Sequence, residues 1–156
     1  MASSAGAIDA ATLSAGDDIL LNAANSIAVI GATTLGLGTT GGDSSIRTQG
    51  GATTLAGLDS FSDVVVDAAG LANLTGVVAA GRNATLTAQD VTLAALNDNG
   101  GTTIATLGAD GDVVVNSAAG IDGGGVRALG NATLTAANAI DISSIEGQAV
   151  SYTHLT

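Results

Sequence analysis

The stretch that decides the fold is GRNATLTAQDVTLAAL, residues 81–96, because a close copy, GNATLTAANAIDISSI, occupies residues 130–145. In both copies apolar and polar residues alternate, and Gly, Asn or Asp stand at the boundaries. A two-residue period is typical of β-strands, since successive side chains point to opposite faces. Gly, Asn and Asp favour turns. The pair therefore predicts short strands, separated by tight turns, in an arrangement that the chain uses more than once.

The similarity extends well beyond this pair of stretches. SDVVVDAAGL from Ser62 corresponds to GDVVVNSAAGI from Gly111, and TTL from Thr53 corresponds to TTI from Thr102. The offset remains between 48 and 50 residues, so these landmarks belong to one long repeat. Shorter units lie within it, because GATTL at residues 31–35 recurs only 20 residues later.

The domain organisation follows from the extent of the repeat. We predict a single β-solenoid repeat domain over residues 1–149, whose long units cover about 16–49, 50–99 and 100–149. The remaining residues, 150–156, read VSYTHLT and hold the only His and the only Tyr. Because this tail departs from the repeat in pattern and composition, we interpret it as non-native, for example as read-through of adapter sequence.

The composition favours a narrow, layered core. The chain of 156 residues is 46% hydrophobic but only 1% aromatic, so its apolar side chains are Ala, Val, Leu and Ile. Its 23 Gly and complete lack of Pro suit tight turns between strands that all donate ladder hydrogen bonds. We therefore expect an all-β fold, a parallel β-helix (β-solenoid) of roughly seven coils. A β-sandwich or a tandem of small all-β domains is the alternative, but those folds usually carry aromatic anchors and Pro in their loops.

Such a solenoid has a definite geometry, with two or three strands in each coil. Parallel coils stack about 4.8 Å apart, so seven of them form a rod about 30–35 Å long. In NATLTA we expect the Asn at a corner, the Leu in an aliphatic ladder and the Thr residues outside. The two ends of the rod leave strand edges unpaired, which predicts end-to-end self-association unless the edges are capped.

The repeats GRNATLTAQDVTLAAL, GNATLTAANAIDI and GDVVVNSAAGI resemble those of filamentous haemagglutinin-type bacterial adhesins, which are exported by two-partner secretion. The resemblance covers residues 7–149. It implies a right-handed parallel β-helix shaft, a location outside the cell or at the bacterial outer surface, and adhesion to host cells or neighbouring bacteria. The export domain of that family carries Asn-Pro motifs, which a chain without Pro lacks. The resemblance therefore implies shaft repeats that space a binding region, with cell-surface molecules as partners of the parent protein.

Charge excludes several partners. Fourteen acidic residues against three Arg and no Lys give a net charge of −11, so the chain has no basic patch for nucleic acid or for an anionic membrane. No apolar run approaches the length of about 20 residues that membrane insertion requires. The absence of Cys removes disulfides and thiolate metal sites. The first sixteen residues lack the basic and apolar regions of a signal peptide.

Two kinds of chemistry would use the acidic residues of the chain. Asp98, Asp110 and Asp112 offer oxygen ligands for calcium, but the glycine-rich calcium-binding nonapeptide does not occur. A glycan-cleaving β-helix would need converging carboxylates. The candidates are Asp63 and Asp67 together with Asp110 and Asp112. Because Asp67 is replaced by Asn in the next copy and no Lys or Trp is present, we interpret these Asp residues as turn residues.

Other polar residues also have plain structural interpretations. The T-x-T pairs at Thr85 and Thr133 resemble ice-binding arrays, but they recur every 48 residues, so we expect an ordinary Thr ladder. The sequons, which begin at Asn73, Asn83 and Asn131, are expected to be Asn at turns. Three basic residues do not align in the repeat and are expected to be isolated surface charges. They are Arg47, Arg82 and Arg127.

The sequence assigns no catalytic, cofactor-binding or metal-ligating residue, and no role as a ligand to His154. We therefore predict a structural shaft fragment of a large secreted or surface-exposed bacterial adhesin, which is not an enzyme and needs no cofactor. The alternative function is that of a binding module, a β-solenoid that binds calcium or ice. A third hypothesis is a glycan-active β-helix enzyme.

Overall fold

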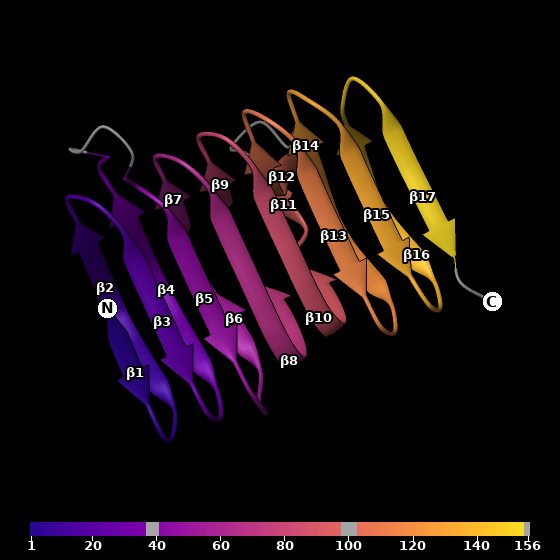
Figure 1. Ribbon diagram of the computed structural model, residues 1–156. Helices are drawn as coiled ribbons and strands as arrows, with labels where there is room; N and C mark the ends of the chain where they lie inside the picture. The colour runs from indigo at the N-terminus through magenta and orange to yellow at the C-terminus, as the bar shows by residue number, and fades with distance from the viewer. Residues whose placement is uncertain (37–40, 98–102, 155–156) are drawn as a thin grey trace.

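The computed structural model describes residues 1–36, 41–97 and 103–154. These residues form a parallel β-solenoid of about seven turns with no helix, as the sequence predicted. The two ends of the chain lie at opposite ends of the stack, and successive coils lie side by side between them (Figure 1). The alternation of apolar and polar residues explains this fold, because each strand needs one face for the core and one for solvent.

One face of the solenoid contains one strand from every coil. We call it the first face. Its strands pair in parallel in the order in which they occur along the chain. They are β1 (Ala2–Ser4), β3 (Ile19–Ala23), β5 (Ser44–Thr48), the first part of β8 (Val64–Leu74), the first part of β10 (Ala84–Leu93), β13 (Val113–Ser117), β15 (Ala132–Ala136) and β17 (Val150–His154).

The return path of each coil bends, so that it supplies two further rows of strands. In β4 the buried residues are Ile27 and Val29, then Ala32 and Thr34, so the alternation shifts by one residue at the bend. We call the rows before and after this bend the second and third faces. Their strands are β2 (Ile8–Ala15), β4 (Ile27–Thr34), β6 (Thr53–Leu55), β7 (Leu58–Ser60), the second part of β8, β9 (Val78–Ala80), the second part of β10, β12 (Thr103–Ala109), β14 (Ile121–Ala128) and β16 (Ile140–Glu146).

The core consists of columns of aliphatic side chains, one member from each coil. The central column of the first face is buried from β3 to β15, and its members have between 0% and 3% of their surface exposed. Because the members are in register, each side chain packs between the one before and the one after it. The column contains Leu21, Ile46, Val66, Leu86, Val115 and Leu134.

The NATLTA copies lie on the same face, as predicted. Leu86 and Leu134 occupy one column two coils apart, with Val115 between them. Asn83 and Asn131 precede their strands and are exposed, and the Thr residues point outward. The long unit of sequence similarity therefore spans two coils rather than one.

Two insertions break the regular spacing of the coils. The first lies between β4 and β5, and the second carries β11 (Leu96–Asn97), which pairs antiparallel with the start of β12. In the corresponding stretches TTL from Thr53 and TTI from Thr102, Thr102 lies outside the described residues. Leu55 and Ile104 are not structurally equivalent, because Leu55 pairs in parallel with Val29 and is buried, whereas Ile104 pairs antiparallel with Leu96 and is exposed.

The two GATTL stretches are likewise not equivalent. Ala32 of the first stretch pairs with Leu58 in the third face, whereas Thr53 of the second pairs with Ile27 in the second face. The two identical segments therefore lie on different faces, because the first insertion increases the number of residues between equivalent positions of these coils.

Residues Val150–His154 continue the ladder of the first face. Val150–His154 pairs in parallel with β15, with Ala132 opposite Val150 and Leu134 opposite Tyr152. This part of the tail therefore occupies the place of a further strand, although its composition differs from that of the repeat. That the tail is non-native remains a prediction.

Candidate functional site

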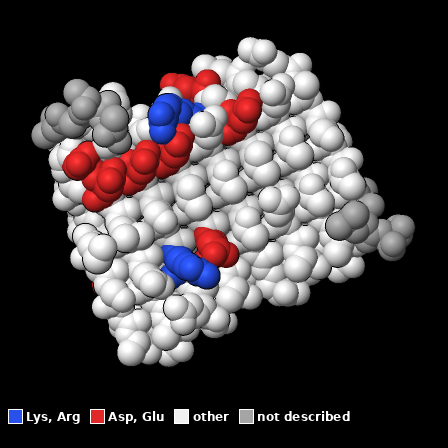
Figure 2. All heavy atoms as spheres, viewed as in Figure 1, with Lys and Arg blue, Asp and Glu red and all other residues white. Residues whose placement is uncertain are grey.

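The main polar feature of the surface is a row of Asp and Asn at one corner of the solenoid. We call this row the Asx ladder. Each member immediately precedes a strand of the first face, where the chain turns into that strand. Figure 2 shows a row of acidic side chains across the coils along one border of this face, interrupted by a basic side chain. The members are Asp18, Asp43, Asp63, Asn83, Asp112 and Asn131.

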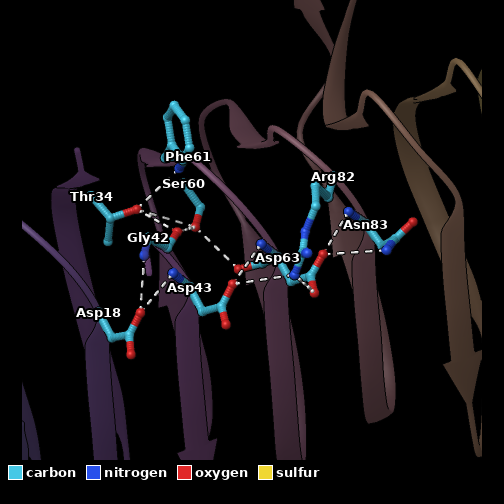
Figure 3. Close-up of polar contacts among 9 residues, drawn as sticks. All are labelled: Asp18, Thr34, Gly42, Asp43, Ser60, Phe61, Asp63, Arg82 and Asn83. Atoms are coloured by element: carbon cyan, nitrogen blue, oxygen red, sulfur yellow. Dashed lines mark hydrogen bonds and ion pairs between the residues drawn. The ribbon is translucent and has the colours of Figure 1, made fainter. Parts of the chain in front are cut away.

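The ladder is held together by bonds from one coil to the next. Asp18 Oδ1 accepts the N–H of Asp43 at 3.0 Å, Asp43 Oδ1 accepts that of Asp63 at 3.0 Å, and Asp63 Oδ1 accepts that of Asn83 at 3.0 Å. The same direction of bonding continues through Asn83 Oδ1 to the N–H of Asp112 at 3.0 Å (Figure 3 shows the first three steps).

The last step repeats the pattern, since Asp112 Oδ1 accepts the N–H of Asn131 at 2.7 Å. A turn leaves a backbone N–H without a strand partner, and a short side chain with an oxygen two bonds from Cβ reaches it. The ladder is therefore a structural device that uses Asp and Asn interchangeably. The sequence predicted turns at Asp63, Asn83, Asp112 and Asn131, whereas the partners of their bonds between coils follow only from the register of the strands.

Arg82 neutralises part of the acidic row. Its Nη2 lies 2.7 Å from Asp63 Oδ2 and 3.9 Å from Asp43 Oδ1, so one guanidinium lies near two carboxylates (Figure 3). About 61% of the Arg82 side chain is exposed, so solvent weakens both contacts. The side chain contributes more to charge balance along the row than to stability.

All three Arg residues pair with acids on neighbouring coils, so the prediction of isolated surface charges was wrong. Arg47 Nε lies 3.3 Å from Asp67, and Arg127 Nε lies 3.5 Å from Glu146. In each of these two pairs the partners are directly opposite in adjacent strands. These ion pairs could not be predicted from the sequence, because they depend on the register between strands of adjacent coils.

A cluster of hydroxyl groups closes the third face next to the first insertion. Thr34 Oγ1 and Ser60 Oγ each donate to the carbonyl of Gly42 at 2.6 Å, and the N–H of Phe61 donates to Thr34 Oγ1 at 3.0 Å. Both hydroxyls are buried. Figure 3 shows the Phe61 ring pointing away from this cluster. These bonds anchor the return of the insertion to the body of the solenoid.

The carboxylates proposed for glycan cleavage do not converge. Asp63 and Asp112 belong to the Asx ladder with Asn83 between them, whereas Asp67 lies on the first face beside Arg47. Asp110 lies two residues before Asp112 in the turn between β12 and β13 (Val113–Ser117), where it lines a groove with Phe61. Of these four carboxylates, only Asp110 is among the residues that line this groove.

The proposed calcium ligands Asp110 and Asp112 share one turn but have different surroundings. Asp112 is engaged in the Asx ladder and Asp110 lies at the groove, whereas Asp98 lies outside the described residues. Within residues 1–36, 41–97 and 103–154, no group of three or more His, Asp or Glu side chains is arranged to hold a metal ion.

The Thr pairs do not form a continuous array. Thr85 and Thr87 are followed on the next coil by Val114 and Asn116, and only then by Thr133 and Thr135. This order gives alternating T-x-T and V-x-N rows on the outer side of the first face. Of the three Asn residues predicted at turns, Asn83 and Asn131 lie at turns in the Asx ladder, but the prediction was wrong for Asn73, which lies within β8 and pairs with Thr54 and Thr92.

Comparisons with protein-family models, with curated proteins and with solved structures found no match for this chain. In the part of the chain that the structure describes, no helix is long and apolar enough to cross a membrane.

Proposed function

We propose that this chain is a shaft segment of a large bacterial adhesin, secreted or held at the cell surface, and that it serves adhesion by holding binding regions at a distance. The observation that carries the proposal is the unbroken column from Leu21 to Leu134, in which every coil rests on the next. A continuous close-packed core resists bending, and a rigid rod is what a spacer requires.

The surface supports the same proposal. The outer positions of the first face carry short side chains such as Thr85, Val114 and Thr133. The carboxylates of the Asx ladder are occupied by backbone N–H groups, so this row holds the coils together. The resemblance of the repeats to filamentous haemagglutinin-type adhesins supplies the biological context of the proposal.

The test compares the chain alone with the chain used as a spacer. Beads are coated with the 156-residue chain, with a small glycan-binding domain, or with that domain attached to the bead through the chain. We expect no saturable adhesion of the first beads to epithelial cells or bacteria, and stronger adhesion of the third beads than of the second. Small-angle X-ray scattering of the chain should give a rod about 30–35 Å long.

Saturable adhesion of the chain alone would overturn the proposal, because the chain would then be a binding module. Calorimetric titration with calcium and an ice-recrystallisation assay address the two alternative modules directly. A positive result in either would replace the shaft proposal with that activity. Release of reducing sugar from a polysaccharide panel would do the same for the glycan-active alternative.

A further inference from the structure

A long open groove crosses the outer side of the third face. It consists of two hollows that share Ala79, Ala80 and Asp110 and are therefore continuous. The lining reaches from Phe61 on one coil to Glu146 four coils later. Because coils lie about 4.8 Å apart, the groove is about 19 Å long, which is the length of an extended segment of about six residues. We call it the third-face groove.

Small side chains form the floor of the third-face groove. Ala79 lies in the outer row between Asp59 and Gly108, so the centre of this row has almost no side chain. Val77 and Ile104 line the same groove and are both exposed. A floor of Ala and Gly lets the backbone of another segment approach closely, and the exposed apolar side chains give that segment a surface to pack against.

Phe61 forms one end of the third-face groove and is held there by glycines. It is 61% exposed, in a chain that is only 1% aromatic. Gly36 lies so close to the ring that a Cβ at this glycine would overlap Cδ1 of Phe61, and a Cβ at Gly42 would lie 2.8 Å from the Phe61 Cβ. On the next coil, Gly81 lines the groove without a side chain that would cover the ring. The ring is therefore positioned in advance and left open to a ligand.

The charge of the third-face groove favours a cation. Asp59 and Asp110 are exposed, and within the part of the chain that the structure describes neither carboxylate has a hydrogen-bond or ion-pair partner. The arginines of the lining, Arg82 and Arg127, are both paired with acids of neighbouring coils. The unbalanced charge of the groove is therefore negative, as is the net charge of the chain, −11. Such a field attracts cationic ligands and repels anionic ones.

We propose that the third-face groove docks an extended basic segment of a partner protein, with one Lys or Arg side chain of that segment over the Phe61 ring and its charge facing Asp59 and Asp110. The ring attracts a cation through its quadrupole, and the long stems of Lys and Arg pack on apolar surface. Charge complementarity selects this occupant. A second copy of the chain has no Lys, and its three Arg are already paired.

Titration of a peptide measures this docking. A fluorescein-labelled peptide of alternating lysine and glycine is titrated with the 156-residue chain and followed by fluorescence anisotropy. The same peptide with glutamine in place of every lysine is the neutral control. We expect weak, saturable binding of the basic peptide alone, with a dissociation constant that rises with salt. In proton NMR the lysine methylene signals should move upfield, because they lie over an aromatic ring.

Three substitutions locate the binding on the chain. Phe61→Leu keeps an apolar side chain but removes the ring, so it should raise the dissociation constant about two- to fivefold and abolish the upfield shift. Asp110→Asn should raise the dissociation constant up to about fivefold. Asp141→Asn removes the same charge at an exposed position of the second face and is the matched control, which should leave the dissociation constant nearly unchanged.

Several results would overturn the docking proposal. Equal weakening by Asp110→Asn and Asp141→Asn would show that the peptide responds to net charge and not to the groove. Equal affinity for the basic and neutral peptides, or no binding up to about 1 mM peptide, would exclude it as well. Far-ultraviolet circular dichroism confirms that each variant is folded. The titration uses the chain free in solution, so its failure leaves the bead test of the shaft proposal unaffected.

Discussion

The Asp63 carboxylate accepts three hydrogen bonds from the next coil: its Oδ1 accepts the backbone N–H of Asn83 at 3.0 Å and Asn83 Nδ2 at 3.3 Å, and its Oδ2 accepts Arg82 Nη2 at 2.7 Å. The first contact is one step of the Asx ladder, which joins six residues from Asp18 to Asn131. An acceptor that bridges two coils fixes their register as well as their spacing.

The Asx ladder should contribute to stability at each step. Asp112→Ala removes the acceptor for the N–H of Asn131 and should lower the free energy of unfolding by about 1 kcal/mol. Asp112→Asn should retain most of this stability, because Asn83 already serves in the ladder. Asp110→Ala, a change at a neighbouring exposed Asp, is the control and should have an effect within about 0.5 kcal/mol. Urea unfolding followed by circular dichroism measures all three.

The aliphatic column should dominate the stability. Leu86→Ala leaves a cavity between Val66 and Val115 and should cost about 2–5 kcal/mol of unfolding free energy. Thr87→Ala, at the adjacent outward position, should change it by less than about 0.5 kcal/mol. Equal urea midpoints for the two variants would contradict the inward assignment of Leu86.

A buried hydroxyl offers a stabilising substitution. Ser44 is 1% exposed, lies in a column between Ile19 and Val64, and its Oγ has no hydrogen-bond partner within the described residues. Ser44→Ala should raise the free energy of unfolding by about 1 kcal/mol, because it removes an unsatisfied polar atom from the core.

Ser60→Ala is the matched control for this substitution, since Ser60 Oγ donates to the carbonyl of Gly42 at 2.6 Å. This variant should be less stable than the parent chain, by about 1 kcal/mol. Thermal unfolding should therefore move the two variants in opposite directions. A decrease for both would show that Ser44 has a partner.

A glycine in β14 is required by its backbone conformation. Gly123 has φ of 115°, and a Cβ there would lie only 1.9 Å from the carbonyl oxygen of Leu93 on the preceding coil. Gly123→Ala should cost more than about 1 kcal/mol through strain and displacement of that coil. Gly108→Ala is the control, because the nearest atom to its Cβ would be 3.8 Å away, and it should be neutral or slightly stabilising.

Removal of one whole coil should preserve the fold. Val64 and Ala84 occupy the same column, so deletion of residues 64–83 joins equivalent positions of successive coils. We expect a folded rod shorter by about 4.8 Å in small-angle scattering, with an unchanged shape of the circular dichroism spectrum. Deletion of residues 64–73 is the control. It removes about half a coil and should give an aggregated or unfolded product, because it misaligns every later column.

The sequence by itself determined the local structure. The alternation in NATLTA assigned Leu86 and Leu134 to the core, the Thr residues to the outside, and Asn83 and Asn131 to corners. These assignments depend only on the two-residue period of a strand and on the turn preferences of Asn, which act within a few residues. The shortage of aromatic residues and the absence of Pro then favoured a solenoid over a sandwich, and the fold confirmed it.

Only the tertiary structure decided how the coils align. The identical GATTL stretches lie on different faces, and the pairs of Arg47 with Asp67 and of Arg127 with Glu146 appear only once the strands are placed side by side. The hydrogen bonds of the Asx ladder likewise depend on how the coils are aligned. Register between coils is set by the packing of columns whose members are many residues apart, and two insertions change that separation. The similarity between repeats does not contain this information, because it relates residue types along the chain and not the side chains that are in contact in the fold.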